Sequence, residues 1–371
     1  MLKRLLTGSL FGLGLVSFLA WVQWYRIRKN RLPASLPTSL IRNPDKAISL
    51  RRTQDTLSVE WEQKTTRADL FLSDVDTDID FDHPVNSVEN QQFAILQGID
   101  KRKRYQVAVK LDDGTILHQI ERVLPLESVP NFRDIGGYQT QEGRGVRWNR
   151  VYRSSALDNL SLEDSQTLEA LNIQLVCDVR SVAEQLSDPD KLPDTMRLIP
   201  TPPSSDDSVL RSVLRLLFQA GFLENLLLDL YQRVMVKDNP QVLARILQEI
   251  SDETNLPMVI HCAAGKDRTG ISIALLLSLL GVPDETIIAD YSLSNYHYDF
   301  FKIATRKNLA QLNMIGISEA DFDYLLVADA DIMQKTLNSI RHGYGSVETY
   351  CRQYLGLSAE TIAKIRENLL D

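Results

Sequence analysis

The chain has 371 residues, of which 44% are apolar and 24% are charged, and this length and composition fit about two ordinary globular domains. Collagen-like, low-complexity and wholly disordered proteins are thereby excluded. The net charge of −8 is unevenly distributed, because the first 32 residues hold six basic and no acidic side chains. The remainder has 35 basic and 49 acidic residues, a net charge of −14. So acidic a body argues against binding nucleic acid through its phosphate backbone.

The N-terminal segment contains an uncharged apolar run, residues 5–25, about as long as a membrane-spanning helix. The run ends in three aromatic residues, as at a membrane interface: Trp21, Trp24 and Tyr25. A cleavable signal peptide is the alternative, but the run is long for one and Ala20 makes a poor cleavage site. We therefore expect a single-pass membrane anchor over residues 1–32 and a linker over residues 33–45. Basic residues flank the run on both sides, so the orientation of the body stays open.

Residues 46–124 are predicted to form short strands, because apolar residues alternate there without helical periodicity. The alternation is clear in two places: Leu57, Val59 and Trp61, and Tyr105, Val107 and Val109. Trp61 and the stretch around Tyr105 resemble the core tryptophan and the tyrosine corner of fibronectin type III domains. That resemblance implies an all-β sandwich of about 80 residues. It would act as a spacer or as a binding module.

From residue 126 onward, predicted strands alternate with predicted helices, as in an α/β domain with a parallel sheet. Two short buried strands are expected, at residues 175–179 and 257–261. Leucines at helical spacing predict a helix within residues 206–236. An apolar run over residues 271–280, ended by Gly281, predicts a core helix.

The second of these strands leads directly into His261-Cys262-Ala263-Ala264-Gly265-Lys266-Asp267-Arg268-Thr269-Gly270, and the core helix follows. A loop between a buried strand and a helix N-terminus collects backbone N–H groups into an anion site. The positive end of the helix dipole favours the thiolate of Cys262 in the same way, which makes Cys262 a nucleophile. Arg268 can bind two phosphoryl oxygens at once. Thr269 can donate a hydrogen bond to the departing sulfur.

The other two cysteines, Cys177 and Cys351, lack such surroundings and are expected to be inert. Three cysteines in a long chain imply no disulfide framework. A structural cysteine with a helix-capping arginine is the alternative for Cys262 and Arg268. His261 is expected to orient the loop through hydrogen bonds rather than to act as a base.

This loop resembles the H-C-x5-R-[ST]-G signature of the cysteine-dependent protein tyrosine phosphatase superfamily. The resemblance is closer to the bacterial tyrosine and lipid (triple-specificity) phosphatases. It covers residues 126–371 and extends to three further stretches: Asn131 to Gly137, Cys177 to Ser181, and Ile288 to Tyr291 with Ser294 and Asn295.

The resemblance implies a two-step reaction in which Cys262 attacks phosphorus and water hydrolyses the phosphocysteine. An aspartate protonates the leaving oxygen and then activates the water. No Trp-Pro-Asp sequence is present, so Asp178 and Asp267 are both candidates, and Asp178 could instead hold Arg268 or Arg180 in place. No cofactor is implied, and no metal-ligand spacing of His and Cys appears.

The resemblance also assigns substrate-binding roles within the loop, to Ala263, Ala264, Gly265, Lys266 and Thr269. Lys266 would add a second cation beside the phosphate, which suits phosphoinositides, or it would be a solvated lysine. Arg133 and Asp134 are expected to support the loop from a neighbouring turn, in which Gly136 and Gly137 allow a tight backbone approach.

We therefore expect a membrane-anchored phosphatase that acts on phosphotyrosine, or also on phosphoserine, phosphothreonine or phosphoinositides. A phosphoinositide-specific phosphatase is one alternative. A phosphate-binding pseudophosphatase or adhesion module is another, although such proteins commonly lose part of the set formed by Cys262, Arg268 and Thr269. A sulfurtransferase or arsenate reductase fits Lys266, Asp267 and the stretch 131–137 poorly.

Overall fold

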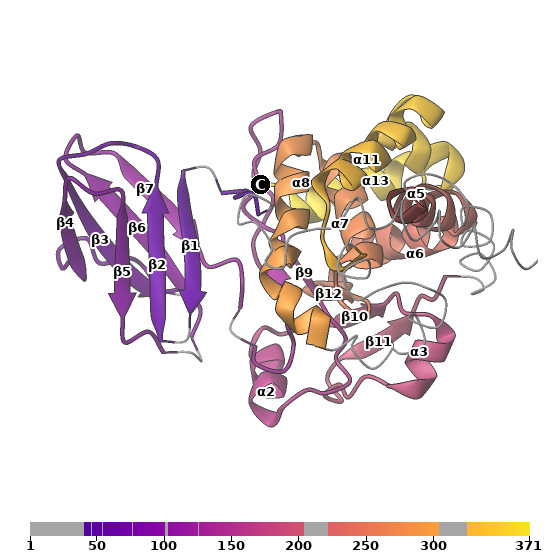
Figure 1. Cartoon of the computed structure of the whole chain (residues 1–371), viewed down its shortest axis with the longest axis horizontal. Helices are drawn as coiled ribbons and strands as arrows, with labels where there is room; N and C mark the ends of the chain where they lie inside the picture. Colours follow the sequence, from indigo (N-terminus) through magenta and orange to yellow (C-terminus); the bar gives the residue numbers. More distant parts are fainter. Residues whose placement is uncertain are drawn as a thin grey trace, which may run out of the picture.

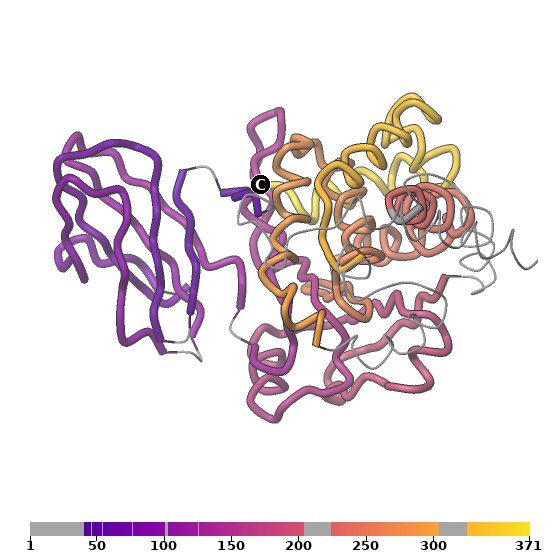
Figure 2. Tube along the Cα trace, viewed as in Figure 1, coloured from indigo at the N-terminus to yellow at the C-terminus, as the bar shows by residue number. Residues whose placement is uncertain are grey.

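The computed structural model describes residues 41–203, 222–303 and 325–371, except Lys46, Gln54, Asp76, Lys101, Arg102 and Pro125. The chain forms an all-β part followed by an α/β part (Figure 1). The Cα trace passes from the first part to the second after β7, while the N-terminal residues 41–45 lie against the second part (Figure 2). There the backbone N–H of Arg42 donates to Ser292 Oγ at 2.8 Å.

The all-β part contains seven strands: β1 (Ile48–Thr53), β2 (Thr56–Trp61), β3 (Arg67–Asp74), β4 (Asn86–Glu89), β5 (Phe93–Gln97), β6 (Tyr105–Leu111) and β7 (Ile116–Ile120). They form two antiparallel sheets, β1-β2-β5 and β4-β3-β6-β7, around one shared core. Trp61 and Tyr105 lie in that core. The Tyr105 hydroxyl accepts the backbone N–H of Asp100 at 3.3 Å. We call this part the β-sandwich.

The α/β part is built on a five-stranded sheet: β8 (Arg133–Asp134), β9 (Val151–Ser154), β10 (Leu175–Asp178), β11 (Arg197–Pro200) and β12 (Met258–His261). The strand order is β11-β10-β12-β9-β8, and all neighbours are parallel except β8 and β9. The central strand β12 is buried along its whole length. Its carboxyl end is where ligand sites form in open α/β sheets.

Helices cover both faces of this sheet (Figure 1). The longer ones are α2 (Leu162–Ala170), α3 (Val182–Ser187), α5 (Phe222–Asp229), the π-helix η2 (Leu230–Asp238), α6 (Pro240–Ser251), α7 (Asp267–Leu280), α8 (Asp284–Ser292), α11 (Ala330–Tyr344) and α13 (Ala359–Leu369). Short turns of helix complete the set: η3 (Glu253–Asn255), η4 (Leu293–His297), α12 (Val347–Thr349) and η5 (Tyr350–Tyr354). Alternate strand residues face opposite layers: Cys177 and Ile260 pack towards α6 and α7, whereas Val176 and Val259 pack towards α2.

The predicted mixed α/β fold is confirmed, and α7 ends at Gly281 in the left-handed conformation, as expected from the sequence. The helix predicted within residues 206–236 is described from Phe222, where α5 continues as a π-helix. The predicted anchor, residues 1–32, lies outside the described residues. Within the described part of the chain, no helix is long and apolar enough to cross a membrane.

Candidate active site

Cys262 lies immediately after the central strand β12 and five residues before the start of α7 at Asp267. Its side chain is buried, and the neighbouring strands β10 and β9 flank it on either side. We call residues 262–268 the Cys262 loop. The loop thus occupies the carboxyl end of the sheet and the N-terminus of a 14-residue helix, where the helix dipole favours negative charge.

The carbonyl groups of the Cys262 loop are held from outside. Asn131 Nδ2 donates to the carbonyl oxygens of Ala264 and Gly265, both at 3.0 Å, and Arg153 Nη2 donates to that of Gly265 at 2.8 Å. In a trans peptide the N–H points opposite to the C=O. The N–H groups of Gly265 and Lys266 therefore face away from Asn131 and Arg153, free to bind an anion.

Gly265 is a position that only glycine fits. Its φ is +63°, which other residues rarely adopt, and a Cβ would lie 2.2 Å from the carbonyl oxygen of Ser154 at the end of β9. The loop therefore packs directly on the neighbouring strand.

A buried ion cluster supports the loop beneath this contact. Asp290 of α8 accepts from Arg133 Nε at 3.1 Å and from Arg153 Nη1 at 2.6 Å, and all three side chains are buried. Burial raises the pKa of Asp290, but the two guanidinium groups outweigh it and hold the pKa well below its usual range. Arg133 also donates to Asn131 Oδ1. Arg133 is thus linked to the Cys262 loop through Asn131.

Asp134 and the adjacent glycines contact other parts of the chain, Arg104 and Trp148. The Asp134 carboxylate binds Arg104 of the β-sandwich rather than the Cys262 loop. Gly136 and Gly137 do allow a tight approach, but to Trp148: a Cβ on either would lie within 2.5 Å of it.

Arg268 is held in place by Glu184, the third residue of α3. Arg268 Nη1 donates to Oε2 at 2.6 Å and Nη2 donates to Oε1 at 2.8 Å. Ser181 N donates to Glu184 Oε2 at 2.7 Å, which completes a capping box. Burial raises the pKa of Glu184, but the hydrogen bonds and charge of Arg268 dominate and lower it to about 2. Glu184 was not anticipated from the sequence, although the Ser-x-x-Glu spacing is itself a signal for a capping box.

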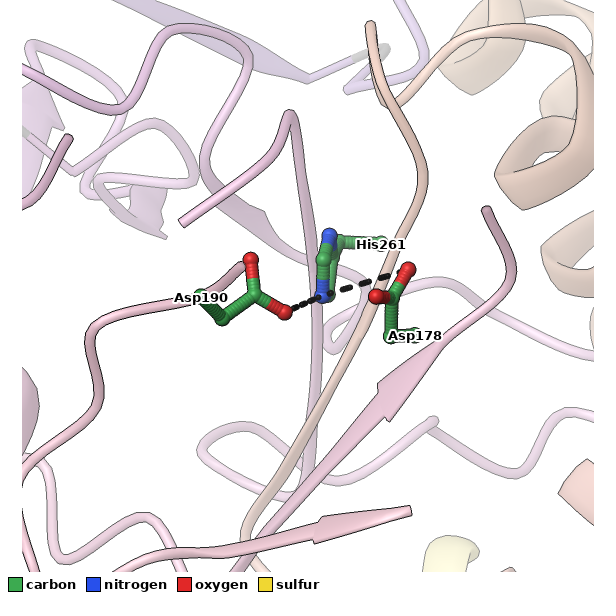
Figure 3. Close-up of side chains that lie close together, drawn as sticks. All are labelled: Asp178, Asp190 and His261. Atoms are coloured by element: carbon green, nitrogen blue, oxygen red, sulfur yellow. Dashed lines mark ion pairs between the residues drawn. The ribbon is translucent and has the colours of Figure 1, made fainter. Parts of the chain in front are cut away.

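Asp178 and His261 lie at the ends of adjacent strands, and Figure 3 shows the His261 imidazole between the carboxylates of Asp178 and Asp190. His261 Nε2 lies 3.0 Å from Asp190 Oδ2 and 3.8 Å from Asp178 Oδ1. The two carboxylates and the imidazole place one potential metal ligand each within 4.8 Å. However, Arg180 Nη2 already lies 2.9 Å from Asp178 and 2.8 Å from Asp190. A guanidinium between the carboxylates supplies the positive charge that a metal ion would, so this donor set fits a metal poorly.

Asp178 is therefore placed as the partner of Arg180 rather than of Arg268. It accepts from both Nε and Nη2 of Arg180 and is buried. Asp190 was missed by sequence reasoning, since nothing marks it in the sequence. Burial raises the pKa of Asp190, but the contact with His261 and the charge of Arg180 outweigh it and lower the pKa.

Asp267 and Lys266 lie at the start of α7. The Asp267 side chain is more than a third exposed and accepts a hydrogen bond from the Tyr231 hydroxyl. The Lys266 ammonium is buried and lies 3.1 Å from Asp267 Oδ1. It also donates to the carbonyl oxygens of Leu325 at 2.7 Å and Val327 at 3.1 Å. Lys266 therefore ties the loop to residues 325–327, and its ammonium is not solvated.

The remaining predicted residues fall into two groups. Thr269 is fully buried, and its hydroxyl has no hydrogen-bond partner among the described residues. Cys177, on β10, and Cys351, in η5, are buried in the hydrophobic core, and burial raises the pKa of each thiol to about 12. Those two thiols are therefore poor nucleophiles near neutral pH.

Comparison with known proteins places this site in a family. Residues 124–371 match the tyrosine phosphatase family. A protein of Cupriavidus necator named as a tyrosine-protein phosphatase is 29% identical over 250 residues, which cover 67% of this chain and 88% of the relative. The triple specificity protein phosphatase of Mycobacterium tuberculosis is 28% identical over 272 residues, covering 65% and 96%. A tyrosine-protein phosphatase of Nostoc commune is 29% identical over 154 residues, covering 40% and 49%.

Proposed function

The chain belongs to the tyrosine phosphatase family through residues 124–371, and from this premise we propose that Cys262 cleaves phosphate monoesters by way of a phosphocysteine. The single observation that supports this proposal most is the position of the Cys262 loop. The carbonyls of Ala264 and Gly265 are bound on the outside of the loop, which leaves N–H groups for an anion beside the thiol.

In the first step, the Cys262 thiolate forms a bond to phosphorus, and the bond from phosphorus to the ester oxygen breaks. A carboxylic acid transfers its proton to the leaving oxygen. In the second step, that carboxylate accepts a proton from water as the water oxygen attacks phosphorus. The sulfur leaves as a thiolate, and inorganic phosphate is released. Arg268 and the loop N–H groups stabilise the charge on the equatorial oxygens in both steps.

We assign the acid role to Asp267. Its carboxyl group belongs to the Cys262 loop and is partly exposed, so it can reach a bound ester. Asp178 is a poorer candidate, because a two-point ion pair with Arg180 occupies its carboxylate and the group is buried. Both carboxylate oxygens of Asp178 already accept hydrogen bonds from Arg180, whereas Asp267 keeps a partly exposed carboxyl group.

The test is the hydrolysis of p-nitrophenyl phosphate by the Cys262→Ser variant. We expect loss of activity to the background level, because serine lacks a stabilised anionic form at this position. Orthovanadate should inhibit the unmodified protein. Cys351→Ser is the matched control, since it changes a buried thiol of high pKa and should leave kcat unchanged. Activity that survives Cys262→Ser would overturn the proposal.

For the substrate, we propose phosphotyrosine in proteins, with phosphoserine, phosphothreonine and phosphoinositides as further substrates. Support comes from the name of the Mycobacterium tuberculosis relative, a triple specificity protein phosphatase. The buried position of Lys266 gives no support to a phosphoinositide-specific enzyme. A panel of phosphopeptides and phosphoinositide vesicles, assayed with the full chain, would rank these substrates.

We further propose that residues 1–32 anchor the protein in a membrane and that the β-sandwich is fibronectin type III-like. The apolar run of residues 5–25 supports the anchor. The sheet orders β1-β2-β5 and β4-β3-β6-β7, with buried Trp61 and the bonded Tyr105 hydroxyl, support the second assignment. Fractionation of cells that express the full chain tests the anchor.

A further inference from the structure

Residues 131–137 face the Cys262 loop on one side and the β-sandwich on the other. On the loop side, Asn131 and Arg133 make the contacts described above. On the other side, Asp134 Oδ2 accepts from Arg104 Nη2 at 3.0 Å. Arg104 precedes β6 and belongs to the β-sandwich. One short stretch of chain thus contacts both the active site and the other domain.

The Asp134 carboxylate is buried at this contact. It accepts the N–H groups of Gly136 and Asn149, each at 2.8 Å. Among the ion pairs of the described residues, its cationic partner is Arg104. Arg104 lies outside residues 124–371, which match the family. The phosphatase domain therefore buries a carboxylate whose counter-charge another domain supplies, and a buried charge without its partner is costly.

A second arginine strengthens the same junction. Arg122 follows β7 and donates to two backbone carbonyls of the 131–137 stretch, at 3.0 and 2.6 Å. It pairs with Asp45 at 2.6 Å, and its guanidinium lies 3.9 Å from the centre of the Tyr138 ring. The Tyr138 hydroxyl in turn donates to Asp290 at 3.0 Å. Asp290 is the carboxylate that binds Arg133 and Arg153 beneath the Cys262 loop.

We propose that Arg104 is a positioning residue for the active site. It fixes Asp134, and through the neighbouring Arg133 and Asn131 this fixes the carbonyl groups of the Cys262 loop. The β-sandwich is then a part of the catalytic unit rather than a spacer. This inference rests on the proposed function, because it concerns the geometry of the same loop.

The test compares Arg104→Met and Arg104→Lys in the full chain. Methionine keeps much of the apolar stem but removes the charge, so Asp134 loses its partner. We expect kcat/KM for p-nitrophenyl phosphate to fall roughly 10- to 100-fold, the size of effect that a displacement of about 1 Å causes in an active site. Orthovanadate should bind more weakly by a similar factor. Lysine can still reach Asp134 with one donor, so Arg104→Lys should restore part of the kcat/KM and part of the orthovanadate affinity.

The matched control is Arg67→Met, which removes an exposed arginine of the same domain that pairs with Asp69 inside the β-sandwich. It should leave kcat/KM and orthovanadate binding within about twofold of the unmodified protein, as expected for a surface pair. All assays are made at a temperature where circular dichroism shows each variant folded. A merely structural role for Arg104 would lower the melting temperature and leave kcat of the folded protein unchanged.

A measurement on the unmodified protein covers the case in which Arg104→Met does not fold. Coupling between two sites is reciprocal, so orthovanadate should slow amide hydrogen exchange both in the Cys262 loop and at residues 121–122 and 134–136. Protection confined to the Cys262 loop would overturn the proposal.

The outcomes separate the two proposals. If the unmodified protein is active and folded Arg104→Met matches it in kcat/KM and orthovanadate binding, the positioning role is wrong and the proposed function stands. If the unmodified protein neither hydrolyses p-nitrophenyl phosphate nor binds orthovanadate, both are wrong. Loss of activity in Arg104→Met with partial rescue by Arg104→Lys supports the positioning role.

Discussion

The guanidinium of Arg268 and the carboxylate of Glu184 are joined at two points, with N–O distances of 2.6 and 2.8 Å. Glu184 is itself fixed by the N–H of Ser181. The pair therefore sets the direction of the Arg268 side chain before any substrate binds. A preset guanidinium loses less side-chain entropy on binding a phosphoryl group, so Glu184 contributes to the site without touching the reacting atoms.

Replacing Glu184 with glutamine should lower activity by loosening Arg268. Glutamine keeps the size of the side chain and one acceptor, but the charge-assisted pair is lost. We expect kcat/KM for p-nitrophenyl phosphate to fall about tenfold, which corresponds to about 1.4 kcal/mol. Glu169→Gln, at an exposed position on α2, is the control. Steady-state kinetics of both variants decide the matter, and equal kcat/KM values for the two would contradict the role of Glu184.

The same pair predicts a pH dependence of stability. The pKa of Glu184 is about 2 in the folded protein, against 4.5 for an unperturbed glutamate. Because the folded value is depressed, the stabilisation is fully present above about pH 4.5 and is lost as pH falls towards 2. The melting temperature of the unmodified protein should therefore exceed that of Glu184→Gln at pH 6, and the gap should shrink between pH 4.5 and 2. A gap that stays constant over that range would show that the carboxylate is not held ionised by Arg268.

The central part of the site was predictable because it is local in sequence. Strand, loop and helix N-terminus follow one another between residues 257 and 280, so Cys262 and Arg268 both lie at the N-terminus of one helix. Gly265 and Gly281 could be read in the same way, since each marks a point where the chain needs a left-handed residue or a close approach.

The partners of these residues were not predictable, because they come from distant parts of the chain. Glu184 lies 84 residues before Arg268, and Arg153 lies 137 residues before Asp290. Which carboxylate meets which guanidinium depends on the order of the strands in the sheet. The sequence alone therefore left Asp178 without a definite partner, whereas the structure gives it Arg180.

Asp267 and Asp178 can be told apart by their effects on different leaving groups. Asp267→Asn removes the proposed acid, so hydrolysis of phosphotyrosine should fall about 100-fold, and p-nitrophenyl phosphate, with its better leaving group, much less. Asp178→Asn leaves Arg180 without one carboxylate and should lower the melting temperature while affecting both substrates equally. A selective loss on phosphotyrosine in Asp178→Asn would reverse the assignment.

Lys266 provides the sharpest distinction between a lipid-specific and a loop-supporting role. Its ammonium is buried and donates to the carbonyls of Leu325 and Val327. Lys266→Met should therefore lower kcat/KM for p-nitrophenyl phosphate and for phosphoinositides by the same factor, because the tether of the loop is lost for every substrate. Lys364→Met, at an exposed site paired with Glu360, should change neither. The measured quantity is the ratio of kcat/KM for the two substrates. If Lys266→Met lowers kcat/KM for phosphoinositides at least about tenfold more than kcat/KM for p-nitrophenyl phosphate, a difference of about 1.4 kcal/mol, then Lys266 leaves its carbonyls to bind a second phosphate.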